Sequence, residues 1–597
     1  MQSEFFQLLM VYISSHNIIS SIGFNTYDNL ENIRKNISGI KLSEDKKLSP
    51  EAVFVSLISD EKINKKFAKI SNLTENYTKY EKLLILSINN ALKNSDIDIL
   101  SPETVFIFST TKGNINLLEK ENIGKFNINR LKLWKSSEII SEFFGKKENI
   151  LTISNACISG SLAIITAQRL IKAKRYKNAV IAGADILSEF TLSGFQAFKA
   201  VSEGACKPFD KNRTGMTPGE GAATVILTSE KSKSNKSGII ISGGASSNDA
   251  NHISGPSRTG EELALTIKSA LKESNLSAEE IDFISGHGTA TLFNDETESK
   301  ALELAGLQNV PVSGTKGYIG HTFGATGIIE TIVAEEAIKN SEIYKTAGFE
   351  NIGVSGKINI QKKYKKAGIN TAVKTASGFG GCNAALVLKK ETFQESENKL
   401  NISSNFNILK KITVKNGDVT INDIIDYKTE EPNNTKFSQI AKSIYKNYKI
   451  KYPKFYKMDN LSKLGFLAAE ILLKNTSVLS KYKPEEIAVI LSNESSSLDT
   501  DAKYQETIND RNNYFPSPGV FVYTLANIMT GEICIRHKIK GENAVFITEN
   551  YDKKFIFDYI SILFADHKAK VSISGRIDYS FPDGNYFTEL YLIECKK

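Results

Sequence analysis

The sequence predicts an α/β protein whose sheets are covered by helices on both faces, because two kinds of segment alternate along the first two-thirds of the chain. The first kind is a short, continuously apolar run, which is typical of a strand buried on both faces. The second is a helix-period segment such as Ser161–Lys172, where Leu162, Ile165 and Leu170 can face a core. We expect strands at Thr104–Thr111, Leu151–Ala156, Ala179–Asp185, Ala222–Thr228 and Gly238–Gly244.

The length of 597 residues is too great for one ordinary hydrophobic core, so two or more domains are expected. The polar stretch Glu391–Asn405 has no apolar periodicity and is interpreted as a linker, residues 391–405. This interpretation divides the chain into a domain at 1–390 and a shorter one at 406–597.

Beyond this linker the order of segments repeats. A helical pattern at Lys79–Asn94 precedes a strand at Thr104–Asn114, and Lys457–Asn475 precedes Ile487–Ser497 by a similar distance. The next two strand segments of the first domain are matched, in order, by Lys540–Asn550 and Lys570–Tyr579. An internal repeat is the most economical interpretation, and chance similarity between amphipathic helices is the alternative.

The composition narrows the possible classes of function. A hydrophobic content of 41% with 24% charged residues is that of a globular protein. The net charge of +8 is mild for this length and indicates a lysine-rich solvated surface, with a local basic patch for an acidic protein partner as the alternative. No zinc-finger spacing, RNP motif or arginine-rich tract is present, so no nucleic-acid partner is expected.

Five scattered cysteines without a CxxC pair argue against a disulfide framework and against a thiolate metal site, and favour a reducing compartment. The N-terminal apolar run FFQLLMVYI is short, carries Glu4 upstream and lacks a basic region. We therefore expect no signal peptide and no membrane span, and a cytoplasmic protein.

The segment SNACISGS, Ser154–Ser161, predicts a nucleophile at Cys157. A buried strand ends at this cysteine and a helix with small residues follows at once, as in the sharp turn of a nucleophile elbow. The helix N-terminus is expected to stabilise the thiolate. A small buried cysteine at a strand end is the alternative.

Two histidines lie in glycine-rich loops that follow strand-like segments. His287 lies in SGHGTATLFNDETE and His321 lies in TKGYIGHTFGATG. The chain has only six histidines, so two of the six lie in loops of this kind. Active sites of open α/β sheets collect at such loops. A single histidine there is more often structural, but two such loops beside a candidate nucleophile favour chemistry.

The motifs NACISG, KPFDKNRTGMTPGEGAA, GHGTAT, KGYIGHTFGATG and SGFGGCNAALVL follow one another in this order. In this the chain resembles the elongating β-ketoacyl-acyl-carrier-protein (ACP) synthases of the thiolase superfamily, from about Val11 to Leu388. The resemblance implies a thiolase-like five-layered αβαβα fold of two similar halves, here 1–240 and 241–390. It also implies Cys-His-His catalysis with no resident cofactor or metal, because the phosphopantetheine arrives on the ACP.

The resemblance assigns roles to individual residues. Cys157 matches the nucleophile that takes an acyl group from ACP, and His287 and His321 match the pair that assists malonyl decarboxylation. Phe379 matches the gating phenylalanine whose N–H joins that of Cys157 in an oxyanion hole. The other matched residues are the supporting Lys316 and Glu330, the pantetheine-contacting Thr289 and Thr291, and Gly378 and Gly380, which let the backbone approach substrate.

Each part answers a chemical need. Thioester transfer places negative charge on a carbonyl oxygen, which two preorganised N–H donors stabilise. Decarboxylation moves electrons onto a thioester oxygen, which neutral imidazoles presenting N–H groups can bind. A covalent acyl-cysteine divides the reaction into two steps.

The chain departs from the family at SGFGGCN, where Ser377 replaces a phenylalanine and Cys382 a threonine. Ser377 could enlarge or polarise the pocket, and Cys382 is interpreted as a small filler. A degradative thiolase uses a second cysteine near here as a base, but both histidine loops and GFGG favour a condensing enzyme. Ketosynthase III-type enzymes use an asparagine at the position of His321, so the histidine disfavours that type.

The second unit lacks this chemistry. Glu549 or Asn550 falls about where Cys157 falls in the first unit, and no histidine loop follows Tyr579. His537 and His567 are interpreted as surface or packing residues. Ser517–Asn543 resembles the segment that precedes the nucleophile strand and contributes to the dimer interface. The unit is similar to the chain-length-factor partners of aryl polyene and flexirubin-type ketosynthases. The segment Leu133–Gly160 of the first unit is similar to the ketosynthases of the same pathways. The alternative is a degenerate duplication that only stabilises the fold.

The resemblance thus implies decarboxylative Claisen condensation of acyl-ACP with malonyl-ACP, in aryl polyene, flexirubin or related biosynthesis. Primary fatty-acid elongation by the same chemistry is one alternative, and an acyl-ACP-binding, length-determining scaffold that does not condense is another. The expected partners are ACP and either a second copy in a homodimer or, within the chain, the C-terminal unit.

Overall fold

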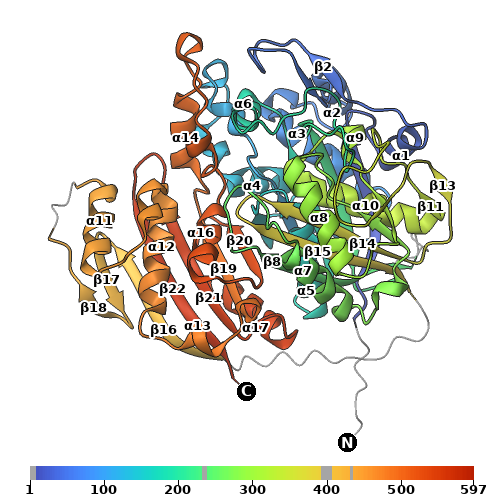
Figure 1. The fold of residues 1–597 in the computed structure, drawn as a ribbon. Coiled ribbons are helices and arrows are strands. Elements are labelled where there is room, and N and C mark those ends of the chain that lie inside the picture. The colour runs from blue at the N-terminus through green and yellow to red at the C-terminus, as the bar shows by residue number, and fades with distance from the viewer. Residues whose placement is uncertain (1–8, 232–237, 392–405, 431–434, 597) are drawn as a thin grey trace, which may run out of the picture.

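The computed structural model describes residues 9–231, 238–391, 406–430 and 435–596, and it confirms the predicted α/β class (Figure 1). Eighteen of the described strands form one hydrogen-bonded set, in which three groups of five strands can be distinguished and are treated below as three sheets, and two short two-stranded sheets stand apart. All five strands predicted in the first 250 residues are present. Among the residues that the structure describes, no helix combines the length and the apolar character needed to cross a membrane.

The first sheet contains both parallel and antiparallel pairs. Its two middle pairs differ in direction, since β4 and β6 run parallel whereas β6 and β7 run antiparallel. The strand order is β5 (Ile150–Ile153), β4 (Thr104–Ser109), β6 (Asn178–Asp185), β7 (Gly221–Thr228) and β1 (Tyr12–Ser20).

The second sheet has the same order and the same strand directions. Its central β14 pairs parallel with β9 and antiparallel with β15. The strand order is β10 (Pro311–Ser313), β9 (Phe283–Ser285), β14 (Thr371–Gly378), β15 (Cys382–Lys390) and β8 (Ile239–Asn248), with the short β12 (Asn359–Ile360) outside β10.

The C-terminal unit repeats this arrangement a third time. The order is β20 (Asn543–Ile547), β19 (Ile487–Asn493), β21 (Val571–Tyr579), β22 (Tyr586–Cys595) and β16 (Phe406–Lys415), extended by β17 (Asp418–Ile421) and β18 (Ile424–Tyr427). The strands predicted as repeats therefore occupy equivalent places. Thr104 begins β4 and pairs with the first residue of β6, as Ile487 begins β19 and pairs with the first residue of β21, so these two residues are equivalent. Two residues further on, Phe106 pairs with Ile150 and Val489 pairs with Asn543. Counting seven residues from each partner makes Asn550 the positional counterpart of Cys157.

Helices separate the first two sheets and cover their outer faces. Helix α3 (Lys79–Leu92) covers the outside of the first sheet, and α7 (Glu261–Glu273) covers the outside of the second. Between the sheets lie α5 (Ser159–Lys172) and α10 (Thr326–Asn340), which contact both. This is the expected five-layered αβαβα arrangement. In the C-terminal unit, α12 (Asn460–Leu473) takes the place of α3.

The C-terminal unit joins the first sheet edge to edge, as Figure 1 shows for β20 beside the N-terminal part of the chain. Phe546 of β20 pairs antiparallel with Ile153 of β5, and the Ser154 N–H donates to the Val545 carbonyl at 3.3 Å. Helix α17 (Lys553–Ala565) packs against α5 across the same boundary. The nucleophile strand and its helix therefore both contact the C-terminal unit.

Two predicted boundaries can be compared with the structure: the division between residues 240 and 241, and the linker at 391–405. The division between 240 and 241 falls inside β8, which begins at Ile239, because the strand continues unbroken through that point. The interpreted linker at 391–405 lies outside the described residues, except for Glu391.

Candidate active site

Cys157 lies on a tight turn between β5 and α5. The strand ends at Ile153, Ala156 adopts a left-handed φ of 49°, and the helix begins at Ser159. A left-handed conformation is unfavourable for a residue with a Cβ, so the surrounding contacts must impose the turn. The Ser159 hydroxyl accepts from the Asn155 N–H at 2.8 Å and donates to the Ala156 carbonyl at 2.6 Å. The half-buried Cys157 is presented as the sequence predicted.

The expected stabilisation of the Cys157 thiolate is wrong for this state of the protein. Burial raises the pKa of the thiol to about 12, and the nearby ammonium of Lys316 only partly opposes that rise. Loss of hydration disfavours the anion more than the helix N-terminus favours it. The resting nucleophile is therefore a neutral thiol whose proton must leave during attack.

His287 follows β9, and a carboxylate orients its loop. Glu298 accepts the N–H of His287 at 2.7 Å and that of Gly288 at 2.8 Å, and it also accepts the Thr375 hydroxyl. Lys316 Nζ lies 3.3 Å from His287 Nδ1 and donates to the His287 carbonyl. With Nδ1 facing an ammonium, the ring proton is placed on Nε2.

His321 is held in the same tautomer by different groups. The N–H of Phe323 donates to His321 Nδ1 at 3.0 Å, and the Thr326 hydroxyl lies 3.1 Å from the same nitrogen. The ring stacks on Phe323 with centroids 5.0 Å apart. Its Nε2 therefore carries the proton, as in His287.

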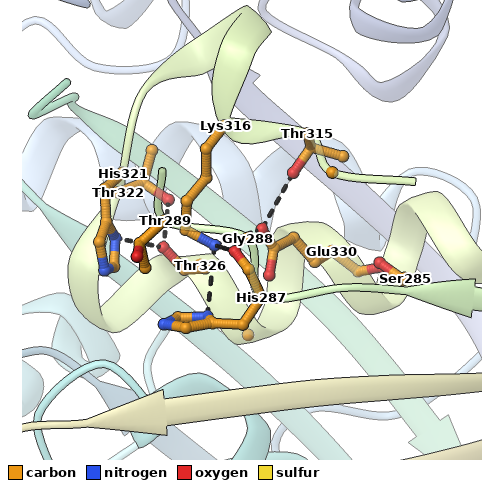
Figure 2. Close-up of polar contacts among 12 residues, drawn as sticks. Ser285, His287, Gly288, Thr289, Thr315, Lys316, His321, Thr322, Thr326 and Glu330 are labelled. Carbon is orange, nitrogen blue, oxygen red and sulfur yellow. Dashed lines mark hydrogen bonds and ion pairs between the residues drawn. The ribbon is translucent and has the colours of Figure 1, made fainter. Parts of the chain in front are cut away.

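A buried charge network supports both rings (Figure 2). Glu330 on α10 binds Lys316 through one oxygen at 2.7 Å. Its other oxygen lies 2.8 Å from the ammonium of Lys374 on β14. Burial, followed by the charges of Lys316 and Lys374, holds the pKa of His287 and of His321 well below the usual value. Both imidazoles are neutral N–H donors, which suits stabilisation of a negative oxygen better than proton storage.

The nucleophile turn and the histidine loops converge. In the first turn of α5, a Cβ on Gly160 would lie 2.9 Å from both the Gly324 carbonyl and the Ile328 nitrogen, so the loop after His321 packs directly on this helix. The rings of His287 and His321 lie 5.5 Å apart and nearly perpendicular. The chain thus brings the Cys157 turn and both histidine loops together beside the first turns of α5 and α10.

The glycine-rich loop that contains Phe379 forms another wall. A Cβ on Gly378 would lie 3.0 Å from the Cys157 nitrogen, so the loop backbone approaches the nucleophile closely. Gly380 has a left-handed φ of 87°. The ring of Phe379 packs against Phe198, with centroids 5.6 Å apart. The turn that carries Phe379 therefore lies beside the Cys157 N–H.

The remaining predicted residues lie around this centre. The hydroxyls of Thr289 and Thr291 are 2.8 Å apart, Thr289 buried and Thr291 half-buried. Ser377 donates to the Asn383 side chain at 2.7 Å. Cys382 is buried, 3.3 Å from the Phe379 carbonyl, and burial keeps its thiol pKa well above the usual value.

Sequence reasoning missed three charged residues of the site. Lys374 completes the Glu330 network, Glu298 orients His287, and Asp185 accepts the N–H groups of Thr111 and Gly324 at 3.0 and 2.7 Å. A charged side chain inside an apolar strand, as in TAVKTASG, is a signal that could have identified Lys374.

Within the described ranges, one group of side chains lies close enough to share a metal ion: His16, Glu335 and Glu336. His16 Nε2 lies 2.9 Å from Glu335 and 3.2 Å from Glu336, which also binds Lys339. A protonated imidazole and this ammonium balance both carboxylates, so the group needs no ion.

Comparisons with known proteins agree with this geometry. The family described as "Beta-ketoacyl synthase, N-terminal domain" matches residues 12–233, and "Beta-ketoacyl synthase, C-terminal domain" matches residues 238–350. The chain is 30% identical over 346 residues to a putative mitochondrial 3-oxoacyl-[acyl-carrier-protein] synthase of Schizosaccharomyces pombe, covering 52% of this chain and 81% of that protein. It is 35% identical to 3-oxoacyl-[acyl-carrier-protein] synthase 2 of Rhizobium meliloti, covering 40% and 61%.

Two solved structures share the fold. "PfaC Keto synthase-Chain length factor" aligns with 98% of this chain and 78% of that chain, with a TM-score of 0.78 and 14% identity. The ketosynthase ApeO in complex with its chain length factor ApeC, from Xenorhabdus doucetiae, aligns with 66% of this chain and all of that one, with a TM-score of 0.58 and 23% identity. The first alignment includes the C-terminal unit.

Proposed function

The chain belongs to the β-ketoacyl synthase family and is an enzyme of the 3-oxoacyl-[acyl-carrier-protein] synthase class, and from this premise we propose which of its residues perform the condensation. In the first step the Cys157 sulfur attacks an acyl-ACP thioester. The acyl group moves to Cys157, and the thiol proton passes to the departing pantetheine thiol. The N–H groups of Cys157 and Phe379 bind the carbonyl oxygen while it is negatively charged.

In the second step malonyl-ACP loses carbon dioxide. Its electron pair forms an enolate, which the Nε2–H groups of His287 and His321 stabilise at the thioester oxygen. The enolate carbon then bonds to the acyl carbonyl, the bond to the Cys157 sulfur breaks, and the thiolate takes up a proton from the solvent. The observation that carries this proposal is that Lys316 Nζ and the Phe323 N–H each face the Nδ1 atom of one ring, which leaves both Nε2 atoms for the proton, while burial holds both pKa values low. The protein itself needs no cofactor or metal for these steps.

We propose that ACP delivers its arm beside the boundary between the two units. A cavity of about 290 Å³ lies there, lined by Phe198 and Ile253 of the first unit and by Val522 of the second. Lys454 and Lys457 of the C-terminal unit also line it. Two ammonium groups beside an apolar cavity suit an acidic carrier protein.

We further propose that the C-terminal unit is an intramolecular, catalytically inactive partner that limits product length. Ring contacts run from His321 through Phe323 and Phe195 to Phe521 of the C-terminal unit, with successive centroids 5.0, 5.4 and 5.4 Å apart. Phe521 fills the space over Gly194, where a Cβ would lie 2.1 Å from the ring. An acyl chain growing toward this boundary would meet Phe521.

This arrangement favours pairing within the chain over a homodimer through β5, because β20 already occupies the edge of that strand. It also favours aryl polyene, flexirubin or related specialised biosynthesis over primary elongation, since a synthase paired with a unit that has Asn550 in place of the nucleophile matches the ketosynthase–chain-length-factor organisation. The five free cysteines support a reducing, cytoplasmic location.

The deciding experiment separates the two steps by mass spectrometry with acyl-ACP and malonyl-ACP. Cys157→Ala should abolish both the acyl-enzyme and the product. His321→Ala should still acylate at Cys157 while decarboxylation falls by about 10²- to 10³-fold. His567→Asn, at an exposed position, is the matched control. Product formation by Cys157→Ala would favour the non-catalytic scaffold, and loss of acylation in His321→Ala would contradict the division of roles.

A further inference from the structure

The peptide group between Phe379 and Gly380 is held at both ends. Its N–H donates to the Ile253 carbonyl at 2.6 Å. Its carbonyl accepts from the side-chain amide of Asn527 at 2.7 Å. Asn527 belongs to the C-terminal unit, directly before α16 (Ile528–His537). A residue of the inactive unit therefore binds the loop that walls the active site of the other unit.

The backbones on the two sides of this contact are in direct apposition. A Cβ on Gly380 would lie 2.5 Å from Asn527 Nδ2, and a Cβ on Gly531 in α16 would lie 2.8 Å from the Gly380 carbonyl. The left-handed turn at Gly380 thus fits against the first turn of α16 only because both positions lack a side chain. The loop cannot move without breaking the contact to Asn527.

The Asn527 amide serves this loop and not its own helix. Asn527 is 2% exposed, and its side chain makes no capping hydrogen bond to α16. Its Oδ1 is buried and has no hydrogen-bond partner among the residues described. A buried acceptor left unpaired is unfavourable. The amide is held in place although only its donor end is satisfied, and that end faces Phe379.

From this geometry we infer that Asn527 is a positioning residue that holds the Phe379 loop closed over the acyl group on Cys157. This inference rests on the proposed function, since it concerns the acyl-enzyme. The resemblance gives Phe379 the gating role, and holding the 379–380 peptide group at both ends fixes the backbone from which this ring reaches Phe198. The C-terminal unit would then keep water from the thioester until malonyl-ACP arrives, in addition to limiting product length.

The variant Asn527→Asp tests this directly because it keeps the shape of the side chain and removes its N–H donors. We expect acylation of Cys157 as in the wild type, but hydrolysis of the acyl-enzyme, in which water adds to the carbonyl and the thiol leaves, about 3- to 10-fold faster. Loss of one typical hydrogen bond raises the population of the open loop by about this factor. Lowering the pH protonates the introduced carboxyl group and returns an O–H donor, so the acyl-enzyme lifetime should recover toward the wild-type value at the same pH.

The control is Asn447→Asp, at an exposed position of the same unit, with lifetimes followed by mass spectrometry from pH 5 to 8. Asn527→Ala is measured beside it, because it removes the donor at every pH, whereas a buried carboxyl group can stay protonated and keep an O–H donor. An acyl-enzyme lifetime in Asn527→Ala equal to that of the wild type would overturn the inference, as would a shortened lifetime in Asn527→Asp that does not recover at low pH. Failure of the wild type to acylate Cys157 would instead refute the proposed function.

Discussion

Arg169 on α5 and Glu542, directly before β20, form a buried ion pair of 2.7 Å across the boundary between the catalytic and C-terminal units. Both side chains are almost fully buried, and Ser246 of β8 also donates to Glu542. The helix that begins beside the nucleophile is thereby anchored to the C-terminal unit at its other end. The C-terminal unit therefore shares a buried polar contact with the catalytic domain.

Removing one partner of this pair should loosen the boundary. We expect Glu542→Gln to destabilise the protein by about 3–5 kcal/mol, because it leaves the Arg169 guanidinium buried without its counter-charge. Urea denaturation followed by fluorescence measures the effect. Glu485→Gln, at an exposed position of the same unit, should change the midpoint little. Equal midpoints for the two variants would show that the pair does not hold the units together.

The second prediction concerns the charge balance around Glu330, whose single carboxylate pairs with both Lys316 and Lys374. We expect Glu330→Gln to cost about 3–5 kcal/mol of stability and to suppress condensation, because two buried ammonium groups then face each other. The double variant Glu330→Gln/Lys374→Met removes one of these charges and should recover part of the lost stability. Additive losses in the double variant would contradict this coupling.

The third prediction follows from the pKa of His16. Burial lowers this pKa, but the charges of Glu335 and Glu336 outweigh burial and raise it from 6.5 to about 9. The folded protein therefore binds a proton that the unfolded chain releases above pH 6.5. This contribution, of the order of 3 kcal/mol, is fully present below pH 6.5 and is lost as the pH rises toward 9.

Thermal unfolding measured at pH 6, 7.5 and 9 tests this linkage. The melting temperature of the wild type should fall over this range by more than that of His16→Gln, which has no proton to lose. The variant should be less stable than the wild type at pH 6 and approach it at pH 9. Parallel pH profiles would place the proton elsewhere.

The sequence allowed prediction of much of the fold and of the central site, for identifiable reasons. Continuous apolar runs marked the strands, and the repeated order of helix and strand marked the third sheet, because both are local patterns. Cys157, His287 and His321 stood out since each follows a strand in a segment of small residues. Lys374 left a local signal, a charge inside an apolar strand, but its partner Glu330 lies in a distant segment. Asn527 left no such signal, because its role arises only when distant segments meet.

The state of Cys157 was also beyond sequence reasoning. The start of a helix is visible as a pattern, and it favours a thiolate. The depth at which the packed layers bury the sulfur is not visible, and it reverses the balance by raising the pKa to about 12.

The last prediction concerns product length. Phe521 of the C-terminal unit packs in the ring cluster with Phe190, Phe195 and Tyr504, and it closes the space over Gly194. We expect Phe521→Ala to lengthen the products by at least one two-carbon unit, because it removes the ring on which a growing chain would end. The matched control is Phe515→Ala on the same unit, where the ring is 74% exposed and limits no internal space. Chromatography of the products formed with malonyl-ACP reports the shift. A large cavity in the core also lowers stability, by about 3–5 kcal/mol for a buried phenylalanine, so product lengths are compared at a temperature where both variants remain folded. An unchanged length distribution with an intact rate would mean that the chain ends elsewhere and that the C-terminal unit does not limit it through Phe521.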